Sequence, residues 1–423
     1  MQRQYWQFFW PLSLTGLAML LARQFQNGTL ARFPEAVDEL AIYAYATCIF
    51  MLFNAMLAFV PQMANVFARS PQAERVCLRF VATLCVTLTA PVAMLAFAPA
   101  GRTLIAKAFD IDGARLAEVL RYLRYMMPLI AINGLRHFYK GMLIQAKRTG
   151  VVTGLTSVFL VVVVAMLLVG LRAGWSAAKT IVLAQVTAGS LDLMLAFVLR
   201  KVLFVFPERQ EHQALTYRET FSFFWPVATT AAMFALSRPI LYSFVSRMPD
   251  GRATVAALRV SFDFAMVFHN PINQFRHLVV TFGRDNLKAL RTFMMRIWTG
   301  VTVVMILIAA TPLSNVIFHS LLGIEGRVLG MTRSVIWVLC FVPLALTIRN
   351  YFHGLSLVGR KTRVMAIGAI CRNITTYMLA WALYEAGWLD HVYAASILVL
   401  GFATEAAVMV ANSRLVARSR AID

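Results

Sequence analysis

Four arginines lie inside long apolar stretches of this 423-residue chain, at Arg23, Arg136, Arg238 and Arg349. An ionisable side chain at the centre of a membrane span costs roughly 2.5–3.5 kcal/mol on insertion scales, and it normally faces the protein interior or a wet cavity. The planar guanidinium stays ionised and pairs with carboxylate or phosphate through two parallel hydrogen bonds. The four arginines therefore predict a binding site for an anionic group.

Other polar residues extend this candidate site. Three further basic residues follow Arg136 or Arg349 closely and are predicted to bind the same anion: His137, Lys140 and His353. Asn54 and His269 occur at a spacing of 215 residues and are weaker candidates for the lining of a cavity. Arg23 and Arg238 also have a structural interpretation, in which their side chains extend to the membrane interface.

Two acids, Asp192 and Glu405, lie among apolar neighbours. They can balance the charge of Arg136 and Arg349 by ion pairing, which is the structural alternative to substrate binding at those arginines. One of them can instead carry a proton or Na⁺, since a buried carboxylate beside positive charge titrates readily. The sequence leaves these roles open. A third acid, Asp263, follows Arg259 by four residues and is predicted to pair with it.

The composition excludes a soluble enzyme of this length. Hydrophobic residues make up 60% of the chain and charged residues 14%, whereas soluble domains are about 45–50% apolar and about 25% charged. The mean hydropathy is +0.70. The net charge of +21 resides mostly between apolar blocks, as expected for cytoplasmic loops facing anionic lipid rather than for nucleic-acid binding.

No enzymatic or metal-binding motif occurs in the sequence. A phosphate-binding G-x-x-x-x-G-K-[ST] loop and an H-E-x-x-H pair are both missing. The five cysteines form no C-x-x-C pair and are predicted to pack in apolar surroundings. We therefore expect no enzyme activity, no cofactor and no metal site, and any transport must be passive or secondary.

Twelve apolar segments have the length of about 20 residues that a transmembrane helix needs. They predict an all-α integral membrane protein with helices over 5–29, 37–60, 77–98, 117–143, 151–171, 177–199, 219–245, 253–275, 290–310, 329–356, 364–384 and 390–412. The first segment has no small-residue cleavage site after it, so we expect a retained helix rather than a signal peptide.

The two halves of the chain repeat each other. The string Phe8-Phe9-Trp10-Pro11 recurs as Phe223-Phe224-Trp225-Pro226, at the spacing of 215 that also relates Arg23 to Arg238. At a spacing of 213, Arg136 meets Arg349 and Asp192 meets Glu405. Six spans per half predict two bundles related by a pseudo-two-fold axis along the membrane normal. Their predicted bounds are 1–204 and 219–423, with a cytoplasmic linker over 205–218.

Loop charge predicts the orientation. The even-numbered loops and the two termini together carry roughly twice as many Lys and Arg residues as the odd-numbered loops. We therefore expect both termini in the cytoplasm and the protein in the plasma (inner) membrane. The expected partners are membrane lipids and a small anionic substrate, with no nucleic acid. An internally doubled chain is expected to function as a monomer.

The doubled six-helix plan with central charges resembles the multidrug/oligosaccharidyl-lipid/polysaccharide flippase superfamily. Within that superfamily, several strings are similar to the progressive ankylosis (ANK) family: Phe224-Trp225-Pro226, Ser237-Arg238-Pro239-Ile240, Phe244-Val245-Ser246-Arg247, Pro343-Leu-Ala-Leu-Thr347-Ile-Arg349 and Gly401-Phe402 with Glu405. The resemblance implies export of small polyanions such as pyrophosphate, ATP and citrate. One departure is Arg23, which stands where the family's first helix has an acidic residue, and it makes the expected cavity more positive.

These observations favour a secondary transporter that exports small polyanions by alternating access through a positive central cavity. One alternative is a flippase for a lipid-linked saccharide bearing pyrophosphate, because the same arginines would suit its headgroup. A cation-coupled multidrug extruder is another, although a positive cavity disfavours cationic drugs. The remaining alternative is a membrane scaffold without transport activity.

Overall fold

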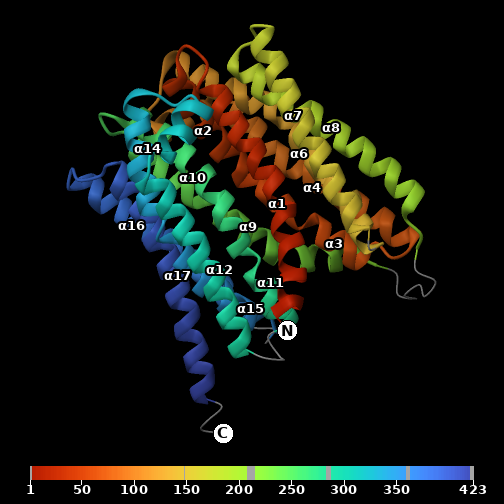
Figure 1. The fold of residues 1–423 in the computed structure, drawn as a ribbon. Helices are drawn as coiled ribbons and strands as arrows, with labels where there is room; N and C mark the ends of the chain where they lie inside the picture. The colour runs from red at the N-terminus through yellow and green to blue at the C-terminus, as the bar shows by residue number, and fades with distance from the viewer. Residues whose placement is uncertain (1, 147, 207–214, 283–286, 359–362, 420–423) are drawn as a thin grey trace. The chain divides into compact units, whose positions relative to one another are not determined.

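A computed structural model describes residues 2–146, 148–206, 215–282, 287–358 and 363–419, which are almost entirely helical and contain no strand (Figure 1). The helices are α1 (Gln2–Leu30), α2 (Ala36–Asn54), η1 (Ala55–Phe59), α3 (Val60–Phe67), α4 (Pro71–Phe97), α5 (Pro99–Phe109), α6 (Gly113–Gln145), α7 (Thr149–Arg172), α8 (Ala177–Leu203), α9 (Tyr217–Val245), α10 (Gly251–Asn273), α11 (Phe275–Phe282), α12 (Leu287–Ala310), α13 (Leu313–Asn315), η2 (Val316–Leu321), α14 (Gly326–Leu339), α15 (Val342–Val358), α16 (Arg363–Glu385) and α17 (His391–Ser419). Each of the twelve predicted spans lies on a helix or on consecutive helices.

Many helices expose large apolar side chains, as a membrane protein requires. Val86 on α4, Val161 on α7 and Val202 on α8 have exposed fractions of 71%, 67% and 72%. Seven helices of the described residues are long and apolar enough to cross a membrane, or eight if the bent pair α14–α15 is one span. Such a surface is stable only against lipid, so the chain is a multi-pass membrane protein.

The second span of each half ends in a short separate helix. In the first half, α2 is followed by η1 and α3, and in the second half α10 is followed by α11. The bounds of α3 and α11 differ by the repeat spacing of 215 at both ends. Glycines let a neighbouring helix approach closely, because a Cβ on Gly141 of α6 would lie 2.5 Å from the carbonyl oxygen of Pro61, and one on Gly354 of α15 would lie 2.4 Å from the Cβ of Val279. Both halves therefore repeat the same close contact.

The predicted helix over 329–356 is interrupted near Pro343, where a proline is expected to bend a helix. Its two parts, α14 and α15, meet at a bend of 41°. Pro343 lies at the start of α15, where its ring and its missing N–H disfavour an uninterrupted helix. The equivalent Pro128 in the first half lies inside α6, which continues through it.

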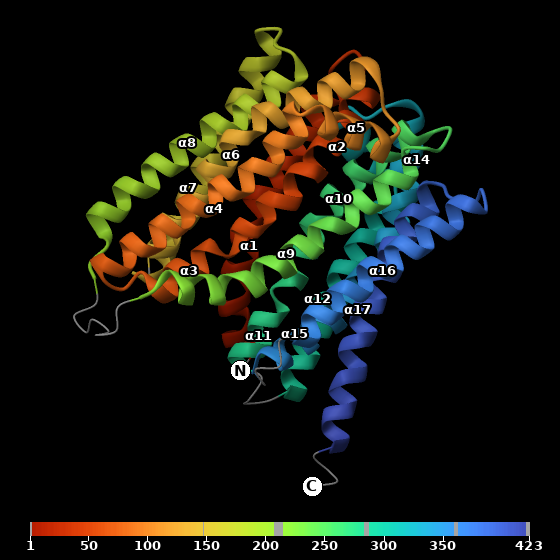
Figure 2. The ribbon, with the colours of Figure 1, turned by 180° about the vertical axis from the view of Figure 1, so that it is seen from behind.

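The chain forms two compact units, Met1–Ala41 with Ile240–Asp423, and Ile42–Pro239. Thus α1 groups with the helices of the second half, and most of α9 groups with those of the first. Within the units, α6 packs on α7 and α8, and α16 packs on α17 (Figures 1 and 2). The division into 1–204 and 219–423 and the pseudo-two-fold axis stay predictions. Residues 207–214 of the expected linker 205–218 lie outside the described residues.

Candidate functional site: two buried charged clusters

The first charged cluster comprises Arg136, Lys140, Asp192 and Phe159. Arg136 and Lys140 are four residues apart on α6 and therefore share one face of that helix. The Asp192 carboxylate, on α8, accepts hydrogen bonds through Oδ2 from Lys140 Nζ at 2.7 Å and from Arg136 Nη1 at 3.3 Å. The Arg136 guanidinium also lies 4.8 Å from the ring centre of Phe159 on α7. The three charged side chains are buried.

The second charged cluster comprises Arg349 and His353 of α15, Arg372 of α16, and Glu405 and Phe402 of α17. Arg372 Nη1 donates to Glu405 Oε2 at 2.6 Å, and Arg349 Nη1 lies 3.6 Å from the same oxygen. His353 Nε2 lies 3.5 Å from Glu405 Oε1. All four ionisable side chains are buried, so one carboxylate is surrounded by three basic groups from two other helices.

Small residues and a shared aromatic ring fix the second charged cluster. A Cβ on Gly368 would lie 3.2 Å from Glu405 Cγ, and one on Gly401 would lie 3.1 Å from Arg372 Cγ. These glycines therefore let α16 and α17 pack closely enough for Arg372 to reach Glu405. The Phe402 ring centre is 5.6 Å from the guanidinium carbons of both Arg349 and Arg372, so one aromatic ring contacts two cations.

The two clusters occupy equivalent positions of the internal repeat. At the spacing of 213, Arg136 corresponds to Arg349, Lys140 to His353, Asp192 to Glu405 and Phe159 to Arg372. The second half thus replaces a lysine with a histidine and a phenylalanine with an arginine. Each cluster keeps two strongly basic side chains, guanidinium or ammonium, for one carboxylate, and the second adds an imidazole.

Each cluster also has buried polar atoms that no described residue satisfies. Arg136 Nε, Asp192 Oδ1 and Arg349 Nε have no hydrogen-bond partner among the residues that the structure describes. A buried polar atom without a partner is costly, and it usually marks a place for water or a ligand. The clusters therefore have unused hydrogen-bonding capacity in addition to their excess of basic groups.

The other predicted site residues lie elsewhere or make different contacts. Arg23 on α1 and Arg238 on α9 are partly exposed and belong to different compact units, and His137 on α6 is partly exposed as well. Asn54 accepts a hydrogen bond of 2.8 Å from Asn133 of α6. His269 is buried, and its helix α10 packs on α14. Their predicted roles in binding stay predictions.

Sequence reasoning missed Arg372, which is 2% exposed. The signal was available, because an arginine in the middle of the predicted span 364–384 is itself a reason to expect a functional or paired charge. The predicted pair of Arg259 and Asp263 is present at 3.6 Å. Its third member was also missed: Asn27 of α1 accepts from Arg259 Nε at 3.1 Å and donates to Asp263 Oδ2 at 3.4 Å.

Among the residues that the structure describes, no group of three or more His, Cys, Asp and Glu side chains could hold a metal ion. The five cysteines are free, and four of them are buried. Their environment agrees with the predicted role in apolar packing.

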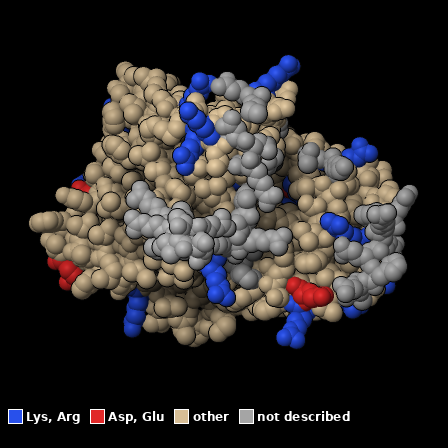
Figure 3. Space-filling model, turned by 90° about the horizontal axis from the view of Figure 1, so that it is seen from below, with Lys and Arg blue, Asp and Glu red and all other residues tan. Residues whose placement is uncertain are grey.

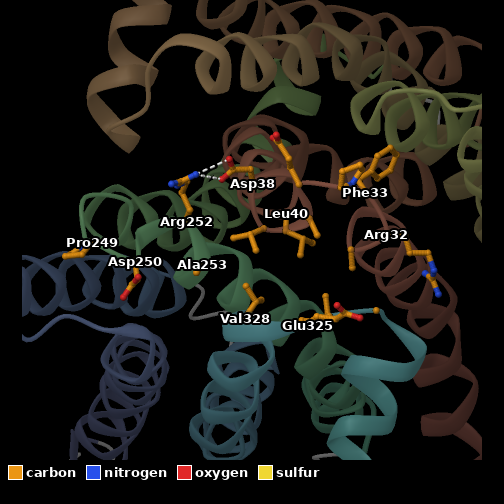
Figure 4. Close-up of a pocket in the computed structure, with 17 residues that line it drawn as sticks. Arg32, Phe33, Asp38, Leu40, Pro249, Asp250, Arg252, Ala253, Glu325 and Val328 are labelled. Carbon is orange, nitrogen blue, oxygen red and sulfur yellow. Dashed lines mark hydrogen bonds and ion pairs between the residues drawn. The ribbon is translucent and has the colours of Figure 1, made fainter.

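A surface pocket of about 750 Å³ lies where the α1–α2 and α9–α10 loops meet the start of α14 (Figure 4). Arg252 donates to both carboxylate oxygens of Asp38, at 2.7 and 3.0 Å, and Arg327 donates to Asp250 at 2.6 Å. Acids and bases are mixed in its lining, so it lacks the excess of basic groups found in the buried clusters.

A sequence profile described as progressive ankylosis protein (ANKH) matches residues 2–261. The chain belongs to this family. Its fold is similar to an inward-facing multidrug resistance MATE family transporter of the MOP superfamily, with a TM-score of 0.72, 14% identity, and coverage of 96% of this chain and 97% of the other. It is also similar to the eukaryotic MATE transporter AtDTX14, with a TM-score of 0.71, 12% identity and coverage of 98% and 96%.

The lipid II flippase MurJ in an inward closed conformation is similar too, with a TM-score of 0.67, 12% identity and coverage of 95% and 87%. The chain therefore belongs to the progressive ankylosis family, has the fold of these transporters and is not an enzyme. The resemblance inferred from the sequence is confirmed.

Proposed function

We propose that this protein exports small polyanions, of the pyrophosphate, citrate or nucleotide type, by alternating access, and that each charged cluster can by itself bind an anionic group. The observation that carries the proposal is the pair of buried clusters at equivalent repeat positions, each with more basic groups than acids. A site that conducts cations would have the opposite balance.

The chemistry of the clusters suits phosphate and carboxylate groups. Arg136 and Arg349 each retain an Nε atom without a partner among the described residues, and the guanidinium fork binds planar or tetrahedral oxyanions through two donors. A polyanion can neutralise the surplus positive charge of a cluster while its carboxylate keeps its existing bonds. Arg23 and Arg238 stay candidates for further contacts with the substrate.

Asp192 and Glu405 serve in this proposal as fixed counter-charges. Without them, two or three basic groups would be buried beside one another, which is strongly unfavourable. A proton-carrying role for either acid is the alternative that the sequence left open. It predicts that substrate flux is coupled to a pH gradient, which the counter-charge role does not.

We propose an inner-membrane location with both termini in the cytoplasm and activity as a monomer. The face seen from below in Figure 3 carries more Lys and Arg than Asp and Glu side chains, and the start of α1 and the end of α17 lie toward the lower side of Figure 1. Positive residues concentrate on the cytoplasmic side of membrane proteins. This charge distribution supports the orientation that loop charge predicts.

A flippase for a lipid-linked saccharide bearing pyrophosphate is the second candidate. The fold similarity to a lipid II flippase favours it, and pyrophosphate would suit the same guanidinium groups. A multidrug extruder has support from fold similarity alone, while the basic clusters disfavour cationic drugs.

Flux in proteoliposomes tests the proposal. Labelled pyrophosphate, citrate and ATP are loaded separately, and wild type is compared with Arg349→Ala, Arg349→Lys and the control Arg333→Ala, which removes an exposed arginine on α14. We expect saturable flux of at least one anion, lost in Arg349→Ala, reduced in Arg349→Lys and retained in the control.

Absence of flux for all three anions would overturn the polyanion proposal and favour the flippase, which a labelled polyprenyl-pyrophosphate saccharide would then test. Equal flux in wild type and in both Arg349 variants would remove the second charged cluster from the binding site.

A further inference from the structure

One face of α10 carries a row of polar residues that bond to α1 and to the start of α2. Their spacings of seven, four and seven residues place them on the same side of a helix: Arg252, Arg259, Asp263 and Asn270. The helix α1 packs directly on α10, and α1, the start of α2 and α10 belong to one compact unit. We call this contact the α1–α10 seam.

The two ends of the seam are closed by polar bonds. At one end, Asn270 Nδ2 donates to the Ser13 carbonyl at 2.9 Å. Gly16 permits this approach, because a Cβ there would lie 2.9 Å from Asn270 Cγ. At the other end, the exposed Arg252 donates to Asp38 at 2.7 Å. The bonds therefore extend along the whole length of the polar row.

The middle of the seam is a buried triad. Asn27 of α1 accepts from Arg259 Nε at 3.1 Å and donates to Asp263 Oδ2 at 3.4 Å, and Arg259 Nη2 lies 3.6 Å from the same carboxylate oxygen. The three residues are at most 4% exposed. Replacement of a buried ion pair by well-packed apolar side chains is often neutral or stabilising. Stability alone therefore does not explain why this contact is polar.

The other half of the repeat has no polar row at the equivalent positions. At the spacing of 215, the row on α10 corresponds to Val37, Ala44, Cys48 and Ala55. Ser13 of α1 corresponds to Ala228 at the same spacing. The repeated fold therefore does not require polar groups at these positions, and the polar row is a specific property of the α1–α10 seam.

Gln24, three residues before Asn27 on α1, is unsatisfied in this conformation. It is only 9% exposed, and neither polar atom of its amide has a hydrogen-bond partner among the described residues. A buried amide without a partner costs free energy. Water would satisfy both atoms if α1 moved away from its neighbours. The closed seam therefore contains a group that favours opening.

We propose that the α1–α10 seam is a gate, closed in this conformation, that opens to water during the transport cycle. The inference rests on the proposed alternating access, in which one half of a repeat moves against the other, but not on the identity of the substrate. In sequence, α1 belongs to the first half and α10 to the second, so their contact changes in such a motion. A polar row is readily hydrated when the helices part, whereas an apolar row resists hydration.

Cysteine reactivity tests the gate without any substrate. Ser13→Cys places a thiol in the seam, where the native residue is 3% exposed, and Thr180→Cys places one between α7 and α8, where the native residue is 0% exposed. The full-length variants in proteoliposomes are treated with a small water-soluble methanethiosulfonate, and mass spectrometry identifies the modified site. We expect Ser13→Cys to react about tenfold faster or more, because access requires opening. Equal rates at the two sites would overturn the inference.

Two substitutions on α1 should change that rate in opposite directions. Gln24→Leu removes the unsatisfied amide, so we expect a higher midpoint of thermal unfolding in detergent and a severalfold slower reaction of Ser13→Cys. Asn27→Leu removes the α1 member of the triad and should make the reaction faster. A reaction that Gln24→Leu accelerates, or that neither substitution changes, would contradict the gate.

A disulfide across the seam tests its role in transport. Gly16→Cys with Asn270→Cys joins α1 to α10, at the close contact described above. The control pair is Gly170→Cys with Thr180→Cys, which joins α7 to α8, because a Cβ on Gly170 would lie 2.8 Å from Thr180 Oγ1. We expect oxidation to abolish anion flux in the first pair, with recovery on reduction, and to leave flux in the control pair. Full flux through the oxidised seam would overturn the inference.

Failure of the gate and failure of the proposed function give different results. Absence of pyrophosphate, citrate and ATP flux in wild type would count against polyanion export, while faster reaction of Ser13→Cys than of Thr180→Cys would still support the gate. Equal reaction rates would overturn the gate even if the wild-type protein transports one of these anions.

Discussion

Each charged cluster surrounds one buried carboxylate with basic side chains, but the two clusters use different residues from different helices. In the first, both basic groups come from α6 and one carboxylate from α8. In the second, the basic groups come from α15 and α16 and surround a carboxylate of α17. Lys140 becomes His353 and Phe159 becomes Arg372 at equivalent positions, so a fixed positive charge is lost from one helix and regained on another.

This exchange indicates that the two halves of the repeat share the same charge balance at this site but place the individual charges on different helices. Because its basic groups belong to two helices, the second charged cluster ties three helices together through one carboxylate. The first charged cluster links two helices by ion pairs, and Phe159 of α7 contacts Arg136 through its ring. Removal of an equivalent residue should therefore have a larger effect in the second cluster.

The largest effect is expected from Glu405→Gln. It leaves Arg349, Arg372 and His353 buried without their carboxylate, and breaking a buried ion pair by removing one partner costs about 3–5 kcal/mol. Asp192→Asn leaves only two basic groups unpaired and should cost less. Chemical unfolding of both variants in detergent measures the difference, and a larger loss in Asp192→Asn would contradict the comparison.

Two substitutions in the first cluster, one that removes a positive charge and one that adds it elsewhere, should compensate each other. Lys140→His alone removes a positive charge beside Asp192, and Phe159→Arg alone adds a buried charge, so each should lower transport about tenfold through misplaced charge. The double variant reproduces the residue types of the second cluster and should recover most of the activity. Anion flux in proteoliposomes at matched protein levels measures the recovery. A lower flux in the double variant than in either single variant would show that the position of each charge matters more than the charge balance of the cluster.

The aromatic rings should have a smaller effect, and an unequal one. Phe402 contacts two guanidinium groups and Phe159 contacts one. A cation–π contact contributes about 0.5–1 kcal/mol at an exposed site and about 2 when desolvated. We expect Phe402→Leu to destabilise more than Phe159→Leu in thermal unfolding, whereas equal losses would mean that only apolar packing is removed.

The smallest effect is expected at the surface pocket. Asp38→Asn removes the exposed ion pair with Arg252, and pairs of this kind contribute about 0–1 kcal/mol because water and salt screen them. Its unfolding midpoint should stay close to that of wild type and respond weakly to added salt. A loss as large as that of Glu405→Gln would show that this ion pair holds the loops together far more strongly than an exposed contact can.

Much of the fold was predictable because hydropathy and repeats are local properties of the sequence. All twelve predicted spans coincide with helices, and the pairs Arg136–Asp192 and Arg349–Glu405 are present as the ion-pairing interpretation predicted. The repeat spacing also related the two clusters before any contact was known. A substrate-binding role for these residues stays a prediction.

The features that were missed depend on contacts between distant helices. Arg372 drew no attention because its repeat counterpart is Phe159, so the comparison of halves gave no charged pair there. The difference between the two prolines was not predictable, because Pro128 and Pro343 look alike in sequence while only Pro343 interrupts its helix.

Binding of labelled pyrophosphate, citrate and ATP to the purified protein tests the central claim most directly, because binding does not depend on coupling or on the direction of flux. The account predicts saturable binding of at least one anion, weakened about tenfold or more in Arg136→Ala and in Arg349→Ala, and unchanged in Arg333→Ala. No saturable binding of any of the three, or one Kd shared by all variants, would contradict it.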